Sequence, residues 1–202
     1  MKLTELLCDL PYSKVFGNTD INITSFTDDS RTVKKGSLFV AVKGLNSDGH
    51  AFVAQAIRKG ALAIIGERNP DKKWLGKVTY VQVENTRNAL GISASSWYEH
   101  PDKKLKIIGV TGTKGKTTTV HMISHILNTL GKKAGFISSI SYRGLHVTTP
   151  AAIEIHKIFK RMILGGKKYA VIEVSSHGID QKRVAGIDFN IGVLTNIAPE
   201  HL

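Results

Sequence analysis

The chain has 202 residues, 42% of them hydrophobic and 22% charged, which is the composition of a globular protein with one large or two ordinary domains. Its single cysteine, Cys8, excludes an internal disulfide and a metal site built from cysteines, which fits a reducing compartment. The net charge of +12 favours anionic partners, and it lies mainly in residues 101–202, which carry 15 Lys and Arg against 6 Asp and Glu, whereas residues 1–100 carry 13 against 10.

The first 16 residues do not have the pattern of a secretory signal, because Glu5 and Asp9 interrupt the apolar run. No apolar run approaches the about 18 residues that a membrane span needs. We therefore expect a cytoplasmic, monomeric chain with no membrane partner. The pairs Lys103-Lys104, Lys132-Lys133 and Lys167-Lys168 are interpreted as solvated helix ends and loops, and their separation argues against a nucleic-acid-binding tail.

In the first half of the chain, short apolar runs alternate with turn residues. Strands are predicted over 36–44, 61–66 and 77–83, because these runs are apolar and bounded by glycine or polar residues. Helices are predicted over 47–61, ending at Gly60, and over 86–98, where Asn85 is the expected N-cap. Alternation of strands and helices favours an α/β fold with a mostly parallel sheet.

The polar segment 99–104 contains a proline and is the predicted domain boundary, so that the domains are 1–100 and 101–202. After it the α/β pattern starts again. The second domain is expected to have a Rossmann-like, mostly parallel sheet, with strands at 105–111, 133–138, 169–174 and 189–195 and helices at 117–130 and 151–164.

The stretch G-V-T-G-T-K-G-K-T-T-T, residues 109–119, lies between an expected strand and an expected helix. A glycine-rich turn in that position directs several backbone N–H groups at an anion beside the positive end of the helix. Lys116 can approach the β- and γ-phosphates of a nucleotide, and the Thr117 hydroxyl is suited to Mg²⁺. The match to a Walker phosphate loop is incomplete, since Val110 stands at the position of the first glycine.

A phosphate loop needs a carboxylate on a neighbouring strand to hold the metal. Glu173 lies within the apolar run 169–174, where a charged side chain is costly to bury unless it has a function. Ser175, His177, Gln181 and Arg183 follow directly, at the carboxyl end of that strand, where open α/β sheets bind their ligands.

Three motifs together resemble the Mur ligase family: T-G-T-K-G-K-T-T from Thr111, E-V-S-S-H-G from Glu173 with Gln181 and Arg183 after it, and T-N-I-A-P-E-H-L from Thr195. Residues 28–65 also resemble the uridine-binding domain of that family. The likeness is strongest to the branch that adds a diamino acid to UDP-N-acetylmuramoyl-L-alanyl-D-glutamate. It implies an ATP-dependent amide ligase of peptidoglycan precursor synthesis, which works through an acyl phosphate and takes these two small molecules as substrates.

The resemblance also implies roles for individual residues. ATP would be held by Gly112, Thr113, Lys114, Gly115, Lys116, Thr117 and Thr118. Lys116, Glu173 and His201 would be catalytic, and Mg²⁺ would be bound by Thr117, Glu173 and His201. The uridine nucleotide would contact Asp28, Ser30, Leu45, Asn46 and Ser47. The muramoyl-peptide part would contact Thr148, Thr149, Ser175, Gln181 and Arg183.

The sequence also departs from the family pattern. Lys114, Leu45 and Val147 stand where the family more often has Asn, His and Asn. The family's carbamoylated lysine and its amino-acid-binding domain lie downstream of the Pro-Glu-His-Leu motif, so we expect a truncated ATP-binding domain that is inactive alone. Two alternatives stay open: a folylpolyglutamate or cyanophycin synthetase of the same superfamily, and a non-catalytic phosphate-loop module that binds nucleotide or nucleic acid through its basic half.

Overall fold

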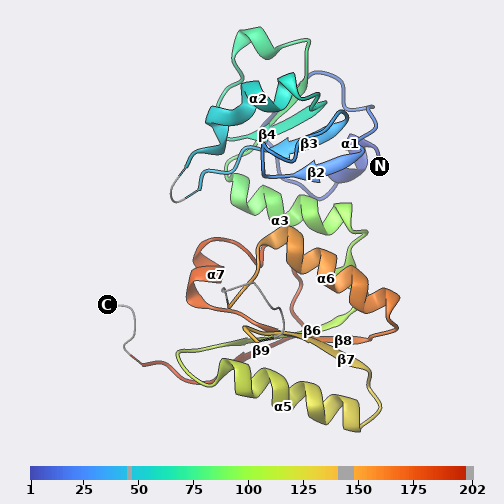
Figure 1. Ribbon diagram of the computed structural model, residues 1–202, viewed down its shortest axis with the longest axis vertical. Helices are drawn as coiled ribbons and strands as arrows, with labels where there is room; N and C mark the ends of the chain where they lie inside the picture. Colours follow the sequence, from blue (N-terminus) through green and yellow to red (C-terminus); the bar gives the residue numbers. More distant parts are fainter. Residues whose placement is uncertain (45–46, 141–147, 199–202) are drawn as a thin grey trace. The chain divides into compact units, whose positions relative to one another are not determined.

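The computed structural model describes residues 1–44, 47–140 and 148–198. The chain folds into two units, Met1–Trp97 and Tyr98–Leu202, and each unit has its own sheet (Figure 1). Both sheets are mostly parallel and are combined with helices, so the predicted α/β fold class is confirmed. No helix in the described part of the chain has both the length and the apolar character to cross a membrane.

The sheet of the first unit has five strands in the order β1-β5-β4-β3-β2. Strands β2 to β5 are parallel to one another, while β1 is antiparallel to β5. The strands are β1 Lys14–Phe16, β2 Ser25–Thr27, β3 Ser37–Val40, β4 Ala63–Gly66 and β5 Thr79–Gln82. The helical segments are α1 Leu3–Leu6, α2 Val53–Arg58, α3 Thr86–Trp97 and the 3₁₀ turns η1 Gly49–Phe52 and η2 Lys72–Trp74.

Helices cover both faces of this sheet. Phe39, Ile64 and Tyr80 point to one face, where they form a core with Val53 and Ala56 from the start and middle of α2. The strand residues between them point to the other face, as the two-residue period of a strand requires, and α3 packs on β3 and β4 there. Figure 1 shows α2 and α3 on opposite sides of the sheet.

The prediction of one continuous α-helix over 47–61 is wrong in part. Asp48 accepts a hydrogen bond from the backbone N–H of His50 and caps the 3₁₀ turn η1, so the α-helical residues begin only at Val53. Gly60, with φ +92°, follows the end of the helix. The elements α1, β1 and β2 were not predicted, because they have three or four residues each and show no periodicity.

The sheet of the second unit has four parallel strands in the order β7-β8-β6-β9. Helix α5 packs on one face, where its Val120 lies against Val110 and Val171, and α6 packs on the other face over Ile107 and Ile172. Figure 1 shows the two helices on opposite sides of this sheet. The elements are α4 Pro101–Lys104, β6 Lys106–Thr111, α5 Lys116–Thr129, β7 Ala134–Ile137, α6 Ala152–Leu164, β8 Tyr169–Glu173, α7 Ser176–Asp180 and β9 Ile191–Leu194.

The polar segment 99–104, which was predicted as the domain boundary, contains a helical turn. Pro101 opens the one-turn helix α4, as a proline at a first helical position can, and α4 packs against α6. Pro101 and Asp102 are both buried. The division between the two units lies before this segment, after Trp97.

Candidate functional site

The loop between β6 and α5 contains two glycines with positive φ, +134° at Gly112 and +83° at Gly115. A Cβ at Gly112 would meet the Thr195 hydroxyl and lie 2.9 Å from the carbonyl oxygen of Asn196, whereas a Cβ at Gly115 would have no atom within 4 Å. Gly115 is the N-cap of α5 and has no side chain with which to cap the first turn. The first amides of α5 are therefore available to an anion at the positive end of the helix.

The segment after β9 holds this loop in place. Asn196 accepts a hydrogen bond from the backbone N–H of Lys114 at 3.0 Å and donates one to the Lys114 carbonyl at 3.1 Å. Thr195 donates to the same carbonyl at 2.7 Å, and Thr113 exchanges hydrogen bonds with the backbone of Ala198. Sequence reasoning assigned no role to Thr195 and Asn196, although their position directly after an apolar strand was a signal.

Lys116 turns back over the loop. Its ammonium group donates to the carbonyl oxygens of Gly112 and Thr113, at 2.7 and 2.9 Å. These bonds keep the ammonium group on the inner side of the loop, where Lys116 also lines a cavity. The position suits a cation that meets a bound phosphate.

Glu173 ends β8 beside the start of α5 and is buried, with 3% of its surface exposed. The Thr117 hydroxyl lies 3.0 Å from both of its carboxylate oxygens. The backbone N–H of Ser139 donates to the same carboxylate at 3.0 Å, and the Ser139 hydroxyl lies 3.2 Å from that of Thr117. Sequence reasoning predicted that Thr117 and Glu173 meet, but missed Ser139.

These oxygen atoms suit Mg²⁺ better than a softer metal. One carboxylate and two hydroxyls are hard ligands, and Mg²⁺ is usually held by one or two carboxylates together with the phosphates of a substrate. Within the described ranges, no group of three or more His, Cys, Asp or Glu side chains is placed to bind a metal. Thr117, Ser139 and Glu173 are therefore the residues that would hold the ion, while His201 lies outside the described residues.

Four of the five residues predicted for the muramoyl peptide form one hydrogen-bonded cluster, in which Thr149 is fully buried, while the fifth, Thr148, lines the neighbouring cavity. Arg183 donates to the Thr149 carbonyl at 2.6 Å and to the Gln181 side chain at 2.8 and 3.1 Å. The hydroxyls of Thr149 and Ser175 are 3.1 Å apart, and Ser175 caps α7 by accepting from the N–H of Gly178. Among the described residues, the acceptors of Arg183 are neutral, so these bonds orient the guanidinium without cancelling its charge.

A cavity of about 620 Å³ lies at the carboxyl ends of the strands of the second unit. Lys116 and Arg183 give it positive charge, and no described acidic side chain lines it, so that it suits an anionic ligand. Lys114 and Thr118 are exposed and do not line it. The lining residues are Thr111, Gly112, Thr113, Lys116, Thr148, Ser175, Ser176, His177, Gln181, Arg183, Leu194, Asn196, Ile197 and Ala198.

The first unit has a cavity of its own, of about 780 Å³. Asp28, Ser30 and Ser47, three of the residues predicted for the uridine nucleotide, line it together with Arg31 and Phe52. The other two, Leu45 and Asn46, lie outside the described residues.

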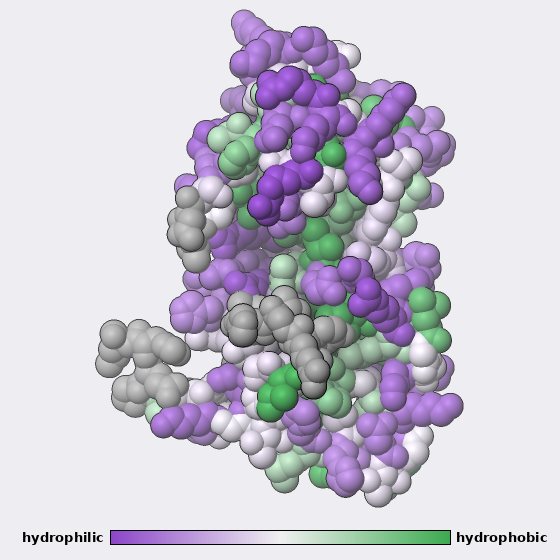
Figure 2. Space-filling model, in the orientation of Figure 1, coloured by the Kyte–Doolittle hydropathy of each residue, from purple (hydrophilic) through white to green (hydrophobic). Residues whose placement is uncertain are grey.

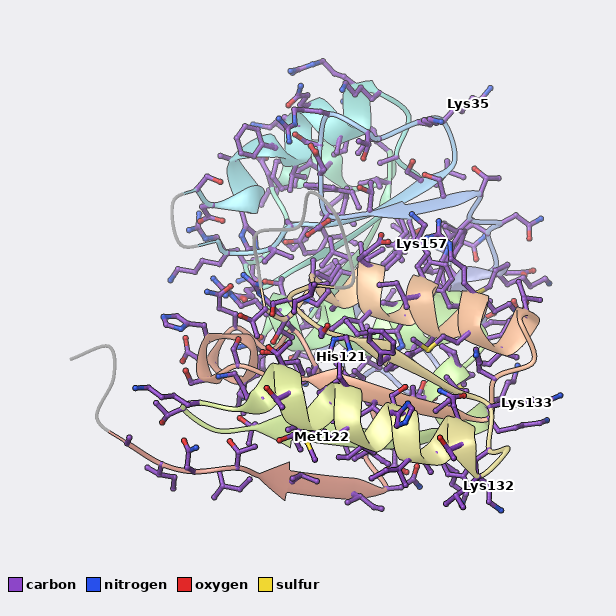
Figure 3. The ribbon with its side chains drawn as sticks, turned by 60° about the horizontal axis from the view of Figure 1, so that its bottom comes forward. Lys35, His121, Met122, Lys132, Lys133 and Lys157 are labelled. Atoms are coloured by element: carbon purple, nitrogen blue, oxygen red, sulfur yellow. The ribbon has the colours of Figure 1, made fainter. Side chains whose placement is uncertain are left out.

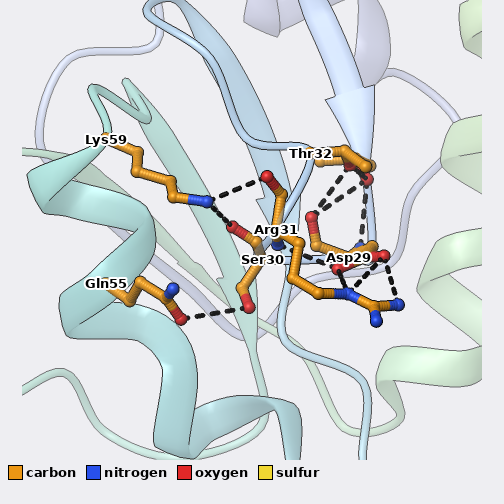
Figure 4. A network of polar contacts seen from close by, with 7 residues as sticks. Asp29, Ser30, Arg31, Thr32, Gln55 and Lys59 are labelled. Carbon is orange, nitrogen blue, oxygen red and sulfur yellow. Dashed lines mark hydrogen bonds and ion pairs between the residues drawn. The ribbon is translucent and has the colours of Figure 1, made fainter.

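Hydrogen bonds order the wall of this cavity, as Figure 4 shows. The Ser30 hydroxyl donates to Gln55 of α2 at 3.3 Å, and Lys59 donates to the Ser30 and Arg31 carbonyls at 3.0 and 2.8 Å. Asp29 pairs with the guanidinium of Arg31 at 2.8 Å, so that this arginine is already occupied by a neighbour.

The Asp28 side chain is exposed to solvent, but the neighbouring protein atoms exclude part of the water around its carboxyl group. This desolvation raises the pKa of Asp28. The negative charge of Asp29 adds to this rise in pKa.

A strand, a glycine loop and a helix with a lysine at its start, facing a buried carboxylate on the next strand, define the class of phosphate-loop α/β proteins. Residues 110–202 match the Mur ligase middle domain, and residues 22–98 match the Mur ligase family catalytic domain. The chain belongs to the Mur ligase family.

Two curated relatives carry the name UDP-N-acetylmuramoyl-L-alanyl-D-glutamate–2,6-diaminopimelate ligase. The protein from Clostridium tetani is 44% identical and the one from Cytophaga hutchinsonii 40% identical, each over the whole of this chain and 43% of the relative. The chain thus spans less than half the length of these relatives.

Solved structures of Mur ligases also match the chain. A structure of a UDP-N-acetylmuramoyl-L-alanyl-D-glutamate–2,6-diaminopimelate ligase matches the whole chain with a TM-score of 0.79 and 25% identity, over 41% of its own length. MurF from Acinetobacter baumannii matches with a TM-score of 0.61 and 26% identity, also over 41% of its length.

Proposed function

We propose that the chain forms the substrate-nucleotide-binding and ATP-binding part of a ligase that joins 2,6-diaminopimelate to UDP-N-acetylmuramoyl-L-alanyl-D-glutamate. Residues 1–97 bind the uridine nucleotide, and residues 98–202 bind MgATP. The names of the relatives support the choice of substrates. The observation that carries the proposal is the contact of Thr117 with buried Glu173 behind a glycine loop, beside a cavity with two cations.

In the proposed reaction, the D-glutamyl side-chain carboxylate attacks the γ-phosphorus of ATP, and ADP leaves. The amine of diaminopimelate then attacks the acyl phosphate carbon, phosphate leaves, and the amine loses a proton. Lys116 and the first amides of α5 hold the triphosphate and stabilise the charge of the transferring phosphoryl group. Thr117 and Glu173 would hold Mg²⁺, which would supply further neutralisation of the phosphate charge.

Arg183 has a separate task in this proposal. Its guanidinium is held by Gln181 and Thr149 and carries a charge that no described carboxylate cancels, so it can bind a carboxylate of the muramoyl peptide. Thr148, Ser175 and Gln181 line the same cavity and can orient the peptide amides. Residues of the loop and of the proposed peptide site line the same cavity, which supports a reaction in which the carboxylate meets the γ-phosphate there.

Substitution of Lys116 tests the nucleotide site. We expect Lys116→Ala to weaken MgATP binding at least tenfold in calorimetry, because a charge-assisted hydrogen bond to phosphate contributes about 1.5–3 kcal/mol. Lys157→Ala is the matched control: it removes the same charge from α6, where Lys157 pairs with Glu154 at 3.3 Å. Equal affinity of the Lys116→Ala and Lys157→Ala proteins for MgATP would contradict the proposal.

A second titration tests the substrate and separates the ligases of the superfamily. We expect UDP-N-acetylmuramoyl-L-alanyl-D-glutamate to bind to the 202-residue chain and a folate to show no heat of binding. Preferential binding of the folate would favour the folylpolyglutamate alternative instead.

A further inference from the structure

The fold brings lysines from three separate segments to one edge of the second sheet. Lys132 and Lys133 precede β7, Lys167 and Lys168 precede β8, and Lys106 begins β6. The backbone N–H of Lys168 bonds to the Lys133 carbonyl at 3.0 Å, and that of Lys106 bonds to the Lys168 carbonyl at 2.9 Å. These five lysines are neighbours in space and are called the basic rim below.

The positive charge of the basic rim is not balanced by ion pairs. Lys104 and Lys160 pair with Glu99, and Lys157 pairs with Glu154, but no rim lysine has such a partner in the part of the chain that the structure describes. Four of the five are exposed, and Lys167 is half-buried. The loop into β9 carries an acid, Asp188, which lies on the β6 side of the rim, near Lys106, while the lysine pair before β7 lies at the other side of the sheet.

Two exposed leucines flank the basic rim. Leu130 follows the end of α5 and is 67% exposed, and Leu164 ends α6 and is 76% exposed. Each is followed by glycine and then by a lysine pair, in L-G-K-K and L-G-G-K-K. Because α5 and α6 cover opposite faces of the sheet, the leucines lie on either side of the rim. In Figure 2, hydrophobic and hydrophilic residues lie next to one another at this end of the unit.

Hydrogen bonds from Asn128 fix the turn that carries Lys132 and Lys133. Asn128 of α5 accepts a hydrogen bond from the N–H of Ala134 at 2.9 Å and donates to the Ala134 carbonyl at 3.1 Å. Lys133 itself has a left-handed backbone, with φ +51°. Figure 3 shows both lysines beyond the end of α5.

We propose that the basic rim and the two leucines form a docking surface for an anionic lipid bilayer. Each lysine near a surface of anionic lipids is attracted to it. The transfer of an exposed leucine side chain from water into the apolar layer of the bilayer is also favourable. A nucleic acid would also attract lysine, but single-stranded contacts rely on aromatic and arginine side chains, which neither the rim nor its flanking leucines supply.

The proposed docking surface goes beyond the proposed ligase function. The expectation of a chain without a membrane partner stays a prediction, and vesicle binding decides between the two. The basic rim lies where β6 begins, and the phosphate loop lies where β6 ends. A bilayer bound at the rim would therefore leave the nucleotide cavity of this unit facing away from the lipid. Membrane binding and nucleotide binding can thus be measured separately.

Sedimentation with vesicles tests the charge. We expect the 202-residue chain to bind vesicles of phosphatidylcholine mixed with phosphatidylglycerol and not vesicles of phosphatidylcholine alone. Lys132→Gln/Lys168→Gln should lower the partition coefficient at least tenfold, since each lysine contributes roughly a fivefold factor. The matched control is Lys34→Gln/Lys35→Gln, which removes two exposed charges from the first unit and should retain most of the binding.

A second variant tests the leucines. Leu130→Ser/Leu164→Ser keeps every lysine and should weaken vesicle binding several-fold, while the thermal unfolding curve by circular dichroism stays close to that of the parent. Three results would each overturn the proposal: equal loss of binding in the rim and control variants, full binding by the leucine variant, or rim-dependent binding to single-stranded RNA with no binding to anionic vesicles.

Discussion

His156 of α6 illustrates what burial does to a single titratable residue. Its ring has no exposed surface, and burial lowers the pKa of His156 to about 4. Asp102, whose carboxylate oxygen lies 4.0 Å from Nδ1, and the Ala185 carbonyl act in the opposite direction but are weaker. The histidine is therefore neutral in the folded protein near neutral pH.

The stability of the second unit should consequently depend on pH through this residue. An unfolded chain binds a proton at His156 below about pH 6.5, while the folded chain does so only near pH 4, so the free energy of unfolding should fall as pH decreases through that interval. The loss is at most about 3 kcal/mol. Urea unfolding followed by circular dichroism at several pH values measures it.

Two substitutions identify the source of this slope. His156→Gln should flatten the slope, because glutamine does not titrate. His125→Gln, on the exposed side of α5, should leave it nearly unchanged. A slope that persists in the His156→Gln protein would show that other groups cause it.

Glu173 is the residue whose placement was best anticipated from sequence. A carboxylate in an apolar strand is so unfavourable that a function was expected for it. Thr117 and Glu173 were predicted to share a Mg²⁺ ion, so their side chains were expected to lie close together. The Ser139 hydroxyl and amide were missed, because nothing in the stretch after β7 marks a particular serine as the one that meets the carboxylate. The metal role of all three residues stays a prediction.

At the scale of elements, the phosphate loop and the segment after β9 form a single unit of structure. The loop bonds to Thr195, Asn196 and Ala198 through both side chains and backbone. Gly112 permits this approach, since any side chain there would strike Thr195 and Asn196. The second glycine, Gly115, meets only the conformational need of the turn.

The two glycines therefore make a matched pair of substitutions. We expect Gly112→Ala to lower the free energy of unfolding of the second unit by about 2–4 kcal/mol, from steric overlap plus backbone strain, and Gly115→Ala by about 1–2 kcal/mol from strain alone. Both tryptophans, Trp74 and Trp97, lie in the first unit, so circular dichroism is the appropriate probe. Equal destabilisation by the two changes would contradict the steric role of Thr195 and Asn196.

Sequence patterns predicted the long elements and missed the short ones. Helices α5 and α6 have 14 and 13 residues, enough for several turns of apolar periodicity, and both were found close to their observed ends. Helix α7 has five residues and was not predicted, because its capping by Ser175 depends on where β8 places that serine. The helix predicted at 47–61 begins instead with the 3₁₀ turn η1, which Asp48 caps, and is α-helical only over Val53–Arg58.

At the scale of the whole molecule, each unit has its own sheet and its own buried core. We expect residues 1–97 to fold when expressed alone, because the core around Phe39, Ile64 and Tyr80 lies within them. Trp74 stacks on Tyr80 and Trp97 lies near Phe26, at centroid distances of 6.4 and 6.1 Å, so tryptophan fluorescence should show one cooperative transition in urea. A fluorescence spectrum of fully exposed tryptophan in buffer would contradict this.

The sequence by itself determined the features that depend on neighbouring residues: the alternation of strands and helices, the glycine loop ahead of a helix, and the unusual carboxylate in an apolar strand. These are local because backbone propensity and periodicity act over a few turns. Only the tertiary structure decided which distant groups meet. The pairing of β6 with β8 and β9 placed Thr117 beside Glu173, 56 residues away, and Asn196 beside Lys114. The pairing of β8 with β7 and β6 joined the separate lysine pairs and Lys106 into one basic rim, because strand register is set by packing across the whole sheet.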